Sequence, residues 1–306
     1  MTPAGHLFSG YLVGEWAAAG EERRWRIIAA AVVGSIVPDL DVALGLLGGW
    51  AGATAHRGAT HSFLGAVALA WVIAALFRRP RRALFVAALG GILTHIFWDW
   101  LNPWGVVPFW PWLKSFRGNL LHEGDLYAAA ILLLACILVW KKQRLLAAAA
   151  LATLLPAYLL TQLWWRDLAR ALARAELAGR QTAVFPTNKL TCGWIVLSAG
   201  DADMSVHCVR SPAAAHLEPA FDVTLRSDSF TQASEQSELV RDFRQKIPFS
   251  FAEVQPAEDA GAVVVWRDLR VAFEEKPSKL PTGIYVRLDP AGKILSERHR
   301  WWLSLW

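Results

Sequence analysis

Five apolar segments within the first 165 residues constrain the fold of this 306-residue chain more than any other feature. They cover residues 27–47, 62–77, 83–98, 126–140 and 145–165. A helix needs about 20 apolar residues to cross a bilayer, so the shorter segments would borrow flanking residues or be re-entrant. The chain also has 17 tryptophans against 4 tyrosines, many of them beside these segments. This placement of tryptophan is typical of the membrane–water interface.

Short basic clusters orient the predicted spans. They lie at residues 23–26, 78–82 and 141–144, each in a turn beside an apolar segment. The positive-inside rule therefore predicts that these turns are cytoplasmic. The net charge of +5 and the pI near 9.3 come largely from such turns, so the charge indicates membrane orientation and we expect no nucleic-acid partner.

After residue 165 the composition becomes mixed and charged. Strands are predicted at residues 192–197, 204–209, 261–266, 283–288 and 294–298, and a helix at 234–244. The predicted fold is an α-helical transmembrane bundle of about four to five membrane segments plus an N-terminal helix, followed by a smaller β-rich extracytoplasmic domain. The predicted parts are a membrane domain, 1–165, a connecting amphipathic helix, 166–180, and a β-rich soluble domain, 181–306.

Cysteine usage agrees with an outer location for the β-rich domain. Cys192 and Cys208 both fall in this region, and a disulfide between them and two free thiols are equally compatible with the sequence. Cys136 lies within an apolar segment and is expected to be a small buried residue.

Histidines and carboxylates cluster between the apolar segments. The clusters contain His6, Asp39 with Asp41, His56 with His61, His95 with Asp99, and His122 with Glu123 and Asp125. Each cluster is at the end of a segment opposite the basic turns, so all five are predicted to gather on the non-cytoplasmic face. Ionisable groups are expensive at membrane depth and usually mark chemistry or transport.

Each pair also has an ordinary structural explanation. His95 and Asp99, at i and i+4, can grip one ion or simply hydrogen bond to each other. His56 and His61 resemble a loop that enters a helix, and Asp39 and Asp41 can cap a helix or turn. Their joint placement on one face favours a site for two or more divalent metal ions. Mixed imidazoles and carboxylates favour Zn²⁺, with Mn²⁺ or Mg²⁺ as alternatives.

The sequence assigns roles as follows. The expected metal ligands are His6, Asp39, His56, His61, His95 and Asp99. Arg57 is expected to stabilise an anionic substrate or transition state, and Asp41 or Glu123 to orient a ligand or move a proton.

These motifs carry a resemblance to a known family. His6-Leu-Phe-Ser-Gly, Pro38-Asp-Leu-Asp, His56-Arg-Gly-x-Thr-His-Ser and Thr94-His-x-x-x-Asp-x-x-Asn-Pro-x-Gly resemble the YdjM-like, LexA-regulated type of membrane-bound metal-dependent hydrolases over residues 1–140. The resemblance implies a bacterial inner-membrane metallohydrolase with these histidines and aspartates as ligands. A weaker resemblance, to the zinc phospholipase C and P1 nuclease class, implies phosphoester cleavage, although this chain has no clear later His-x-x-x-Glu.

We therefore expect a multi-pass protein of the bacterial inner membrane, with its active site and C-terminal domain on the periplasmic side. Metal-activated water would attack a phosphoester of a lipid or lipid-linked substrate at the outer interface. Two alternatives remain open. A transporter or proton relay would use the same polar cluster, and a non-catalytic scaffold would keep the metal for stability. The sequence does not indicate the oligomeric state.

Overall fold

The computed structural model describes residues 3–22, 24–42, 57–77, 81–112, 114–189, 191–225, 228–257, 260–274 and 282–300. The chain forms two compact units. The first contains residues 1–166 with 186–188, and the second contains residues 167–185 with 189–306.

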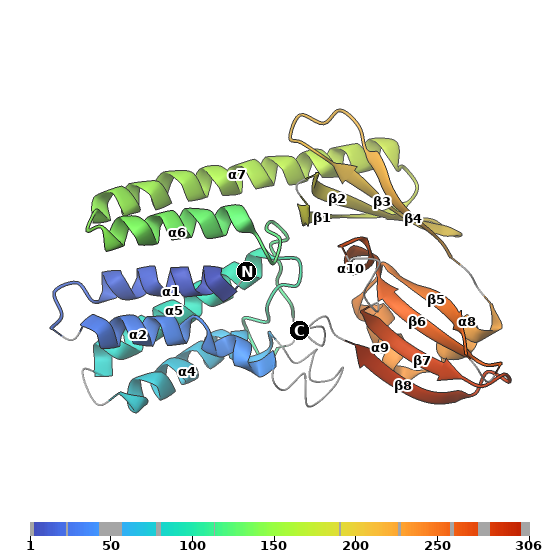
Figure 1. Ribbon diagram of the computed structural model, residues 1–306, viewed down its shortest axis with the longest axis horizontal. Coiled ribbons are helices and arrows are strands. Elements are labelled where there is room, and N and C mark those ends of the chain that lie inside the picture. Colours follow the sequence, from blue (N-terminus) through green and yellow to red (C-terminus); the bar gives the residue numbers. More distant parts are fainter. Residues whose placement is uncertain are drawn as a thin grey trace. The chain divides into compact units, whose positions relative to one another are not determined.

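The first unit is helical (Figure 1). Its elements are α1 (Pro3–Ala17), α2 (Arg24–Gly34), η1 (Val37–Asp41), η2 (Ala59–His61), α4 (Phe63–Leu76), α5 (Arg81–Leu101), α6 (Leu126–Trp140) and α7 (Arg144–Glu176). Runs of alanine and leucine favour helix, and side-chain caps fix where two of the helices begin. The Ser62 hydroxyl accepts a hydrogen bond from the Gly65 amide at the start of α4, and Asp125 accepts one from the Ala128 amide at the start of α6.

Among the described residues, two helices are long and apolar enough to cross a membrane, namely α5 and α7. Helices α4 and α6 have only 14 and 15 residues, or roughly 21–23 Å at 1.5 Å per residue, against a hydrocarbon core of about 30 Å. The prediction of four to five spans was therefore too high for the described residues. The predicted span at 27–47 is interrupted because α2 ends at Gly34, close to Pro38, and residues 43–56 lie outside the described ranges.

Helix α7 runs without a break through Pro156 to Glu176. It therefore includes both the fifth apolar segment and most of the residues for which the sequence predicted a separate amphipathic helix. An apolar first part followed by a charged last part explains why the sequence suggested two elements.

Close packing of α2 against α5 depends on small residues. A Cβ atom on Gly91 would lie 2.1 Å from the Ala31 carbonyl oxygen, and one on Gly34 would lie 2.4 Å from the Ala88 carbonyl oxygen. Glycines that permit such backbone approach are typical of helix contacts in membranes. The buried residues around this contact include Ile27, Ala30, Ala31, Leu84, Ala87, Ala88 and Ile92.

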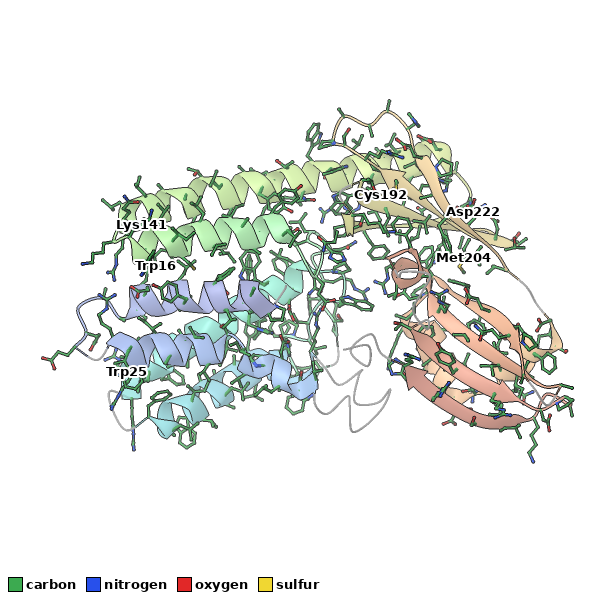
Figure 2. All side chains as sticks on the ribbon, in the orientation of Figure 1. Trp16, Trp25, Lys141, Cys192, Met204 and Asp222 are labelled. Atoms are coloured by element: carbon green, nitrogen blue, oxygen red, sulfur yellow. A yellow bond between two sulfur atoms is a disulfide. The ribbon has the colours of Figure 1, made fainter. Side chains whose placement is uncertain are left out.

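The turns from α1 to α2 and from α6 to α7 lie at the same end of the helical unit (Figure 1). At this end Glu15 is buried and pairs with Arg24 at 2.7 Å and with Arg144 at 3.1 Å, which joins α1, α2 and α7. Trp16, Trp25 and Lys141 also lie there (Figure 2). Exposed tryptophans beside basic residues are typical of a cytoplasmic membrane interface.

The second unit contains two antiparallel four-stranded meanders. The first consists of β1 (Gln181–Lys189), β2 (Cys192–Ala199), β3 (Asp203–Val209) and β4 (Glu218–Thr224). The second consists of β5 (Ser250–Pro256), β6 (Ala262–Asp268), β7 (Gly283–Leu288) and β8 (Ile294–Arg300), with α8 (Ser229–Ser234), α9 (Glu238–Lys246) and α10 (Leu269–Glu274). The β-rich prediction is confirmed, although β1, β4 and β5 were not predicted.

The β-rich unit contains one of the two cysteine arrangements that the sequence left open, namely the disulfide. Cys192 of β2 and Cys208 of β3 form a disulfide with their Cα atoms 5.4 Å apart. Cys136 of α6 is a free, buried thiol. The disulfide joins neighbouring strands around a core that includes Ile195, Leu197, Val206, Phe251 and Leu269.

We expect Gly91→Ala to destabilise the helical unit, by about 1–3 kcal/mol, because its methyl group would overlap the backbone of α2. Gly90→Ala is the matched control, since a Cβ there would meet only a Val13 methyl group, at 2.8 Å. Thermal unfolding of the detergent-purified protein measures both variants. Equal losses in the two variants would contradict the close α2–α5 contact.

Candidate metal centre

Three short segments bring the candidate ligands together. Asp39 lies in η1, directly after Pro38, and His61 ends η2, immediately before the Ser62 cap of α4. His95 and Asp99 are one helical turn apart on the buried face of α5. All four residues are therefore held by the ends or faces of helices.

One potential ligand atom from each of Asp39, His61, His95 and Asp99 lies within 4.8 Å of the other three. His95 Nε2 is 3.1 Å from His61 Nε2, 3.3 Å from Asp39 Oδ1 and 3.7 Å from Asp99 Oδ2. His61 Nε2 is 3.5 Å from Asp39 Oδ1 and from Asp99 Oδ2.

These separations suit a tetrahedral metal site. Ligand bonds of about 2.0–2.2 Å in a tetrahedron place neighbouring ligand atoms roughly 3.3–3.6 Å apart. The five distances that join the two imidazoles to each other and to the two carboxylates lie between 3.1 and 3.7 Å. Two nitrogen and two oxygen donors are also a ligand set that Zn²⁺ accepts.

The site is closed on the side of α5 and open beside Asp39. The side chains of His61 and His95 are completely buried and that of Asp99 is 2% exposed, whereas that of Asp39 is 34% exposed. A small molecule would therefore approach the group past Asp39.

Hydrogen bonds fix the tautomer of His95. Its Nδ1 lies 2.8 Å from the Ser35 carbonyl oxygen, which can only accept a hydrogen bond. His95 therefore carries its proton at Nδ1, and the lone pair of Nε2 faces the site. Metal-ligating histidines commonly have such a carbonyl partner.

A second chain of hydrogen bonds orients His61. The Thr60 hydroxyl donates its proton to Asp41 Oδ2 at 2.5 Å. The same hydroxyl oxygen therefore accepts the hydrogen bond that His61 Nδ1, 2.9 Å away, donates. Asp41 Oδ2 is also 3.5 Å from His61 Nδ1. Asp41 thus supports the imidazole of His61 at its Nδ1 side, and Nε2 of His61 faces the other candidate ligands.

Two imidazole lone pairs 3.1 Å apart repel each other unless a cation lies beside them. A metal ion is one such cation, and a second proton on His61 is the other. Burial opposes that proton, but hydrogen bonds with Asp39, Asp41 and Asp99 outweigh burial and raise the pKa of His61 to about 10. This arrangement therefore favours positive charge between these four side chains.

Arg57 occupies the flank of the site in a left-handed backbone conformation, with φ at 68°. Its guanidinium donates to Asn102 Oδ1 at 2.7 Å and to Glu123 Oε1 at 3.0 Å, and lies 3.3 Å from Asp99 Oδ2. Its backbone amide faces Asp41 Oδ2 at 3.4 Å. Arg57 is only 9% exposed, so its N–H groups face mainly the protein interior.

His6 lies next to the group but outside it. Its ring stacks on that of His95 with centroids 3.9 Å apart, and its Nε2 is 3.5 Å from Asp99 Oδ1. Its Nδ1 is buried and makes no hydrogen bond with any described residue. His6 thus approaches the Asp99 oxygen that faces away from His61 and His95.

The structure brings most of the predicted residues to one place. Asp39, His61, His95 and Asp99 form the group, Asp41 and Arg57 support it, Glu123 pairs with Arg57, and His6 stacks beside it. His56 lies outside the described residues. Ser35 and Thr60, which contact His95 and His61, were not among the predicted site residues. Thr60 directly precedes a candidate ligand, whereas the role of a backbone carbonyl such as Ser35 leaves no signal in residue type.

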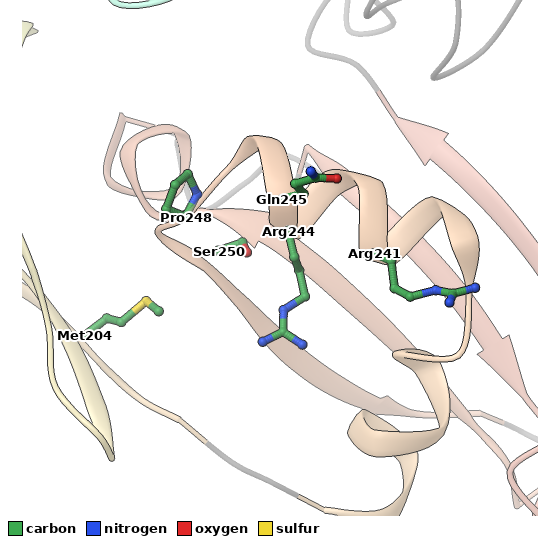
Figure 3. A pocket seen from close by; sticks show the side chains of 6 residues that line it. All are labelled: Met204, Arg241, Arg244, Gln245, Pro248 and Ser250. Atoms are coloured by element: carbon green, nitrogen blue, oxygen red, sulfur yellow. The ribbon is translucent and has the colours of Figure 1, made fainter.

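A cavity of about 370 Å³ in the β-rich unit is a competing site (Figure 3). It is lined by Met204, Arg241, Arg244, Gln245, Pro248 and Ser250. Arg244 pairs with Glu235 at 2.5 Å and lies over the Trp266 ring. Because this lining contains neither histidine nor carboxylate, the cavity does not have the chemistry of the helical site.

Comparison with known proteins agrees with the helical unit. The family described as "YdjM inner membrane protein" matches residues 1–169. Two curated relatives, each named inner membrane protein YdjM, come from Escherichia coli K12 and Shigella flexneri. Each is 33% identical over 111 residues, which cover 32% of this chain and 55% of the relative.

This chain thus spans about half the length of the curated relatives that it matches. No solved structure matches it. The family match covers more than half of the chain and includes every residue of the candidate metal centre. The chain therefore belongs to the YdjM family of inner membrane proteins.

Proposed function

We propose that this protein is an integral-membrane metal-dependent hydrolase. The observation that carries the proposal is the pair of histidine Nε2 atoms, 3.1 Å apart, both oriented by Nδ1 contacts and flanked by two carboxylates. A cluster gathered within 4.8 Å also suits one binding site better than a proton relay, whose groups would be spread through the membrane depth.

Asp39, His61, His95 and Asp99 would hold a divalent ion, with Zn²⁺ preferred and Mn²⁺ or Mg²⁺ as alternatives. When bound, such an ion activates water and polarises an ester or phosphoryl oxygen. The chain supplies the buried wall from α5 and the approach past Asp39. A second ion, expected from the sequence, would need ligands outside this group, and His6 Nε2 with Asp99 Oδ1, 3.5 Å away, offers one such pair.

Asp41 and Arg57 would act as positioning residues. Asp41 holds Thr60 and thereby the tautomer of His61, and Arg57 holds the Asp99 carboxylate through a direct contact and through Asn102. This differs from the substrate-binding role expected for Arg57, because its guanidinium is already engaged by three side chains. Glu123 is 31% exposed and is the better candidate for moving a proton at the edge of the site.

The proposed substrate is a phosphoester of a lipid or lipid-linked molecule. A site at the end of the bundle opposite the basic turns would lie at the outer membrane interface, where such head groups are found. The same orientation would put the β-rich unit in the periplasm. Its Cys192–Cys208 disulfide supports this, since disulfides persist in oxidising compartments.

We expect the detergent-purified wild type to contain close to one equivalent of Zn²⁺ per chain, and His95→Ala to lose it. The matched control is His207→Ala in β3, which removes an imidazole outside the helical site and should retain the metal. Elemental analysis by mass spectrometry measures all three proteins. Chelation should also lower the melting temperature of the wild type. An ion present at a concentration 100 times its Kd adds about 2.7 kcal/mol to the free energy of unfolding.

The outcomes separate the alternatives. Metal bound by the wild type together with chelator-sensitive cleavage of phosphoesters supports the hydrolase. Metal without turnover of any ester in a panel of phospholipids and lipid-linked phosphates indicates a metal-stabilised scaffold. No metal in the wild type would leave the protonated His61 as the cation and would favour a relay or transporter.

We expect Asn102→Ala to weaken metal affinity by about 10- to 100-fold, as is usual when a supporting hydrogen bond to a ligand is removed. The Asn102 amide oxygen accepts from Arg57 and from the Trp104 and Gly105 amides, and its nitrogen donates to Asp99. Metal titration measures the affinity. Asn188→Ala, which truncates an exposed asparagine of β1, is the control, and equal affinities in the two variants would show that Asn102 does not position Asp99.

The proposed orientation predicts which cysteines a membrane-impermeant maleimide can reach. In a Cys136→Ser background, Leu295→Cys in β8 should be labelled in cells with only the outer membrane permeabilised. Lys141→Cys, in the turn between α6 and α7, should be labelled only after the inner membrane is opened. The reverse pattern would overturn the orientation.

A further inference from the structure

The loop between α5 and α6 has an exposed aromatic tip that the catalytic proposal does not use. The Val106 amide donates to the Phe116 carbonyl at 2.9 Å, and the Phe116 amide donates back at 2.8 Å, which closes the loop into a tight ribbon. The tip between these residues contains Phe109, Trp110 and Trp112. Its described residues are 107–112, 114 and 115.

This aromatic loop is attached directly to the elements of the metal centre. The Val107 amide donates to the Arg57 carbonyl at 3.1 Å, and the Phe63 amide at the start of α4 donates to the Pro108 carbonyl at 2.9 Å. Arg57 contacts the candidate ligand Asp99, and the candidate ligand His61 lies two residues before Phe63. The loop tip and the metal centre therefore keep a fixed spacing.

Large apolar side chains at the tip face outward. Phe109 is 50% exposed, Trp110 38% and Trp112 74%. Burying one such ring removes some 150–250 Å² of surface from water, so their exposure in a loop closed by the Val106–Phe116 hydrogen bonds indicates a partner.

The apolar surface continues from the loop onto the short apolar helix α4. Phe109 contacts Phe63 with ring centroids 5.5 Å apart, and Phe63 opens an outward-facing row on α4 that includes Leu64, Val67 and Trp71. In an inner membrane protein the bilayer covers such a row, so the same bilayer is the natural partner of the adjoining loop.

Charge on the loop points to the head groups rather than the hydrocarbon. Lys114 lies over the Phe116 ring at 5.4 Å, and Arg117 follows directly. The described residues 107–117 contain these two cations and no carboxylate. Tryptophan together with lysine or arginine is the composition of segments that lie at an anionic membrane surface.

We propose that the loop of residues 107–116 docks into the head-group layer of an anionic bilayer and delivers membrane-resident amphiphiles to the metal centre. The docking follows from the loop alone, whereas the delivery of a substrate rests on the proposed hydrolase function. The substrate class is then an amphiphile with a long apolar chain and an anionic phosphoester head, which reaches the site from the bilayer side.

The depth of the loop can be measured without any activity. Trp112→Cys, in a Cys136→Ser background, is spin-labelled and reconstituted into vesicles of phosphatidylethanolamine and phosphatidylglycerol. Collision rates with oxygen and with a water-soluble nickel chelate report depth. Trp71→Cys, in the middle of α4, and Leu295→Cys, in β8, serve as references for hydrocarbon and water.

We expect the oxygen-to-nickel ratio at position 112 to lie between those of the two references. Changing Lys114→Gln, or replacing phosphatidylglycerol by phosphatidylcholine, should shift the ratio toward that of water. A ratio equal to that at position 295 would overturn the docking. So would an immobilised label that neither reagent reaches, since that result would assign the surface to another part of the chain or to a second copy.

A second experiment tests the delivery of substrate. The double variant Phe109→Ala/Trp112→Ala should lower turnover of a vesicle-embedded long-chain phosphoester by about tenfold or more relative to a soluble short-chain phosphoester. Trp71→Ala, on the same apolar surface but away from the loop, should leave this ratio at the wild-type value. An unchanged ratio in the double variant would overturn the delivery.

The spin-label experiment tests the docking and the turnover ratio tests the delivery, so each proposal can fail without the other experiment failing. If no phosphoester is cleaved by the wild type, the hydrolase proposal and the delivery fail together, while the spin-label measurement still decides the docking. If cleavage occurs but the label at position 112 behaves as it does in water, the hydrolase proposal stands and the docking is wrong.

Discussion

The hydrogen bond from His95 to the Ser35 carbonyl depends on how closely α2 approaches α5. A Cβ atom on Gly91 would also lie 3.1 Å from the Ser35 amide nitrogen, so any side chain there would push the end of α2 away. With glycine in place, the Ser35 carbonyl comes within 2.8 Å of His95 Nδ1 and turns Nε2 toward His61. A helix contact between two small residues thus determines the orientation of an imidazole one turn away, and with it the chemistry of the site.

A network of ion pairs and hydrogen bonds around Arg57 explains why buried polar groups are tolerated here. A desolvated charge is costly unless it is paired, and a pair is favourable only if its geometry is maintained. Asp99 is held by Arg57 and approached by His6, and Arg57 is held in turn by Asn102 and Glu123. The network gives Asp99 and Arg57 partners of opposite charge, while the buried Nδ1 of His6 has no hydrogen bond with a described residue. The carboxylates of Asp39 and Asp99 lie close enough together to favour a cation between them.

Much of this arrangement was predictable because it depends on residue type and spacing. The i, i+4 spacing put His95 and Asp99 on one helical face, and the basic turns predicted that the polar clusters gather at the opposite end of the helices. Asp39, His61, His95 and Asp99 do lie together. The rest depends on tertiary structure. An apolar run does not show that α2 ends at Gly34, before Pro38, and the left-handed backbone of Arg57 has no signature in a non-glycine residue. The contacts of Arg57 with Asn102, Glu123 and Asp99 likewise could not be read from the sequence, and the predicted contact of Arg57 with a substrate stays a prediction.

Helix α5 relates the site to membrane depth. At 1.5 Å per residue, His95 lies about 21 Å and Asp99 about 27 Å along the axis from Arg81, the basic residue at the start of the helix. If Arg81 marks the cytoplasmic boundary of a hydrocarbon core of about 30 Å, the ligands lie just inside the outer boundary. Under the proposed hydrolase function a soluble substrate would then have to enter the membrane to be cleaved, whereas the phosphate of a lipid would lie only a few ångströms above the site. On the same assumption the loop that follows α5 would begin at that level, and its tryptophans and its lysine would lie at the depth that such residues prefer.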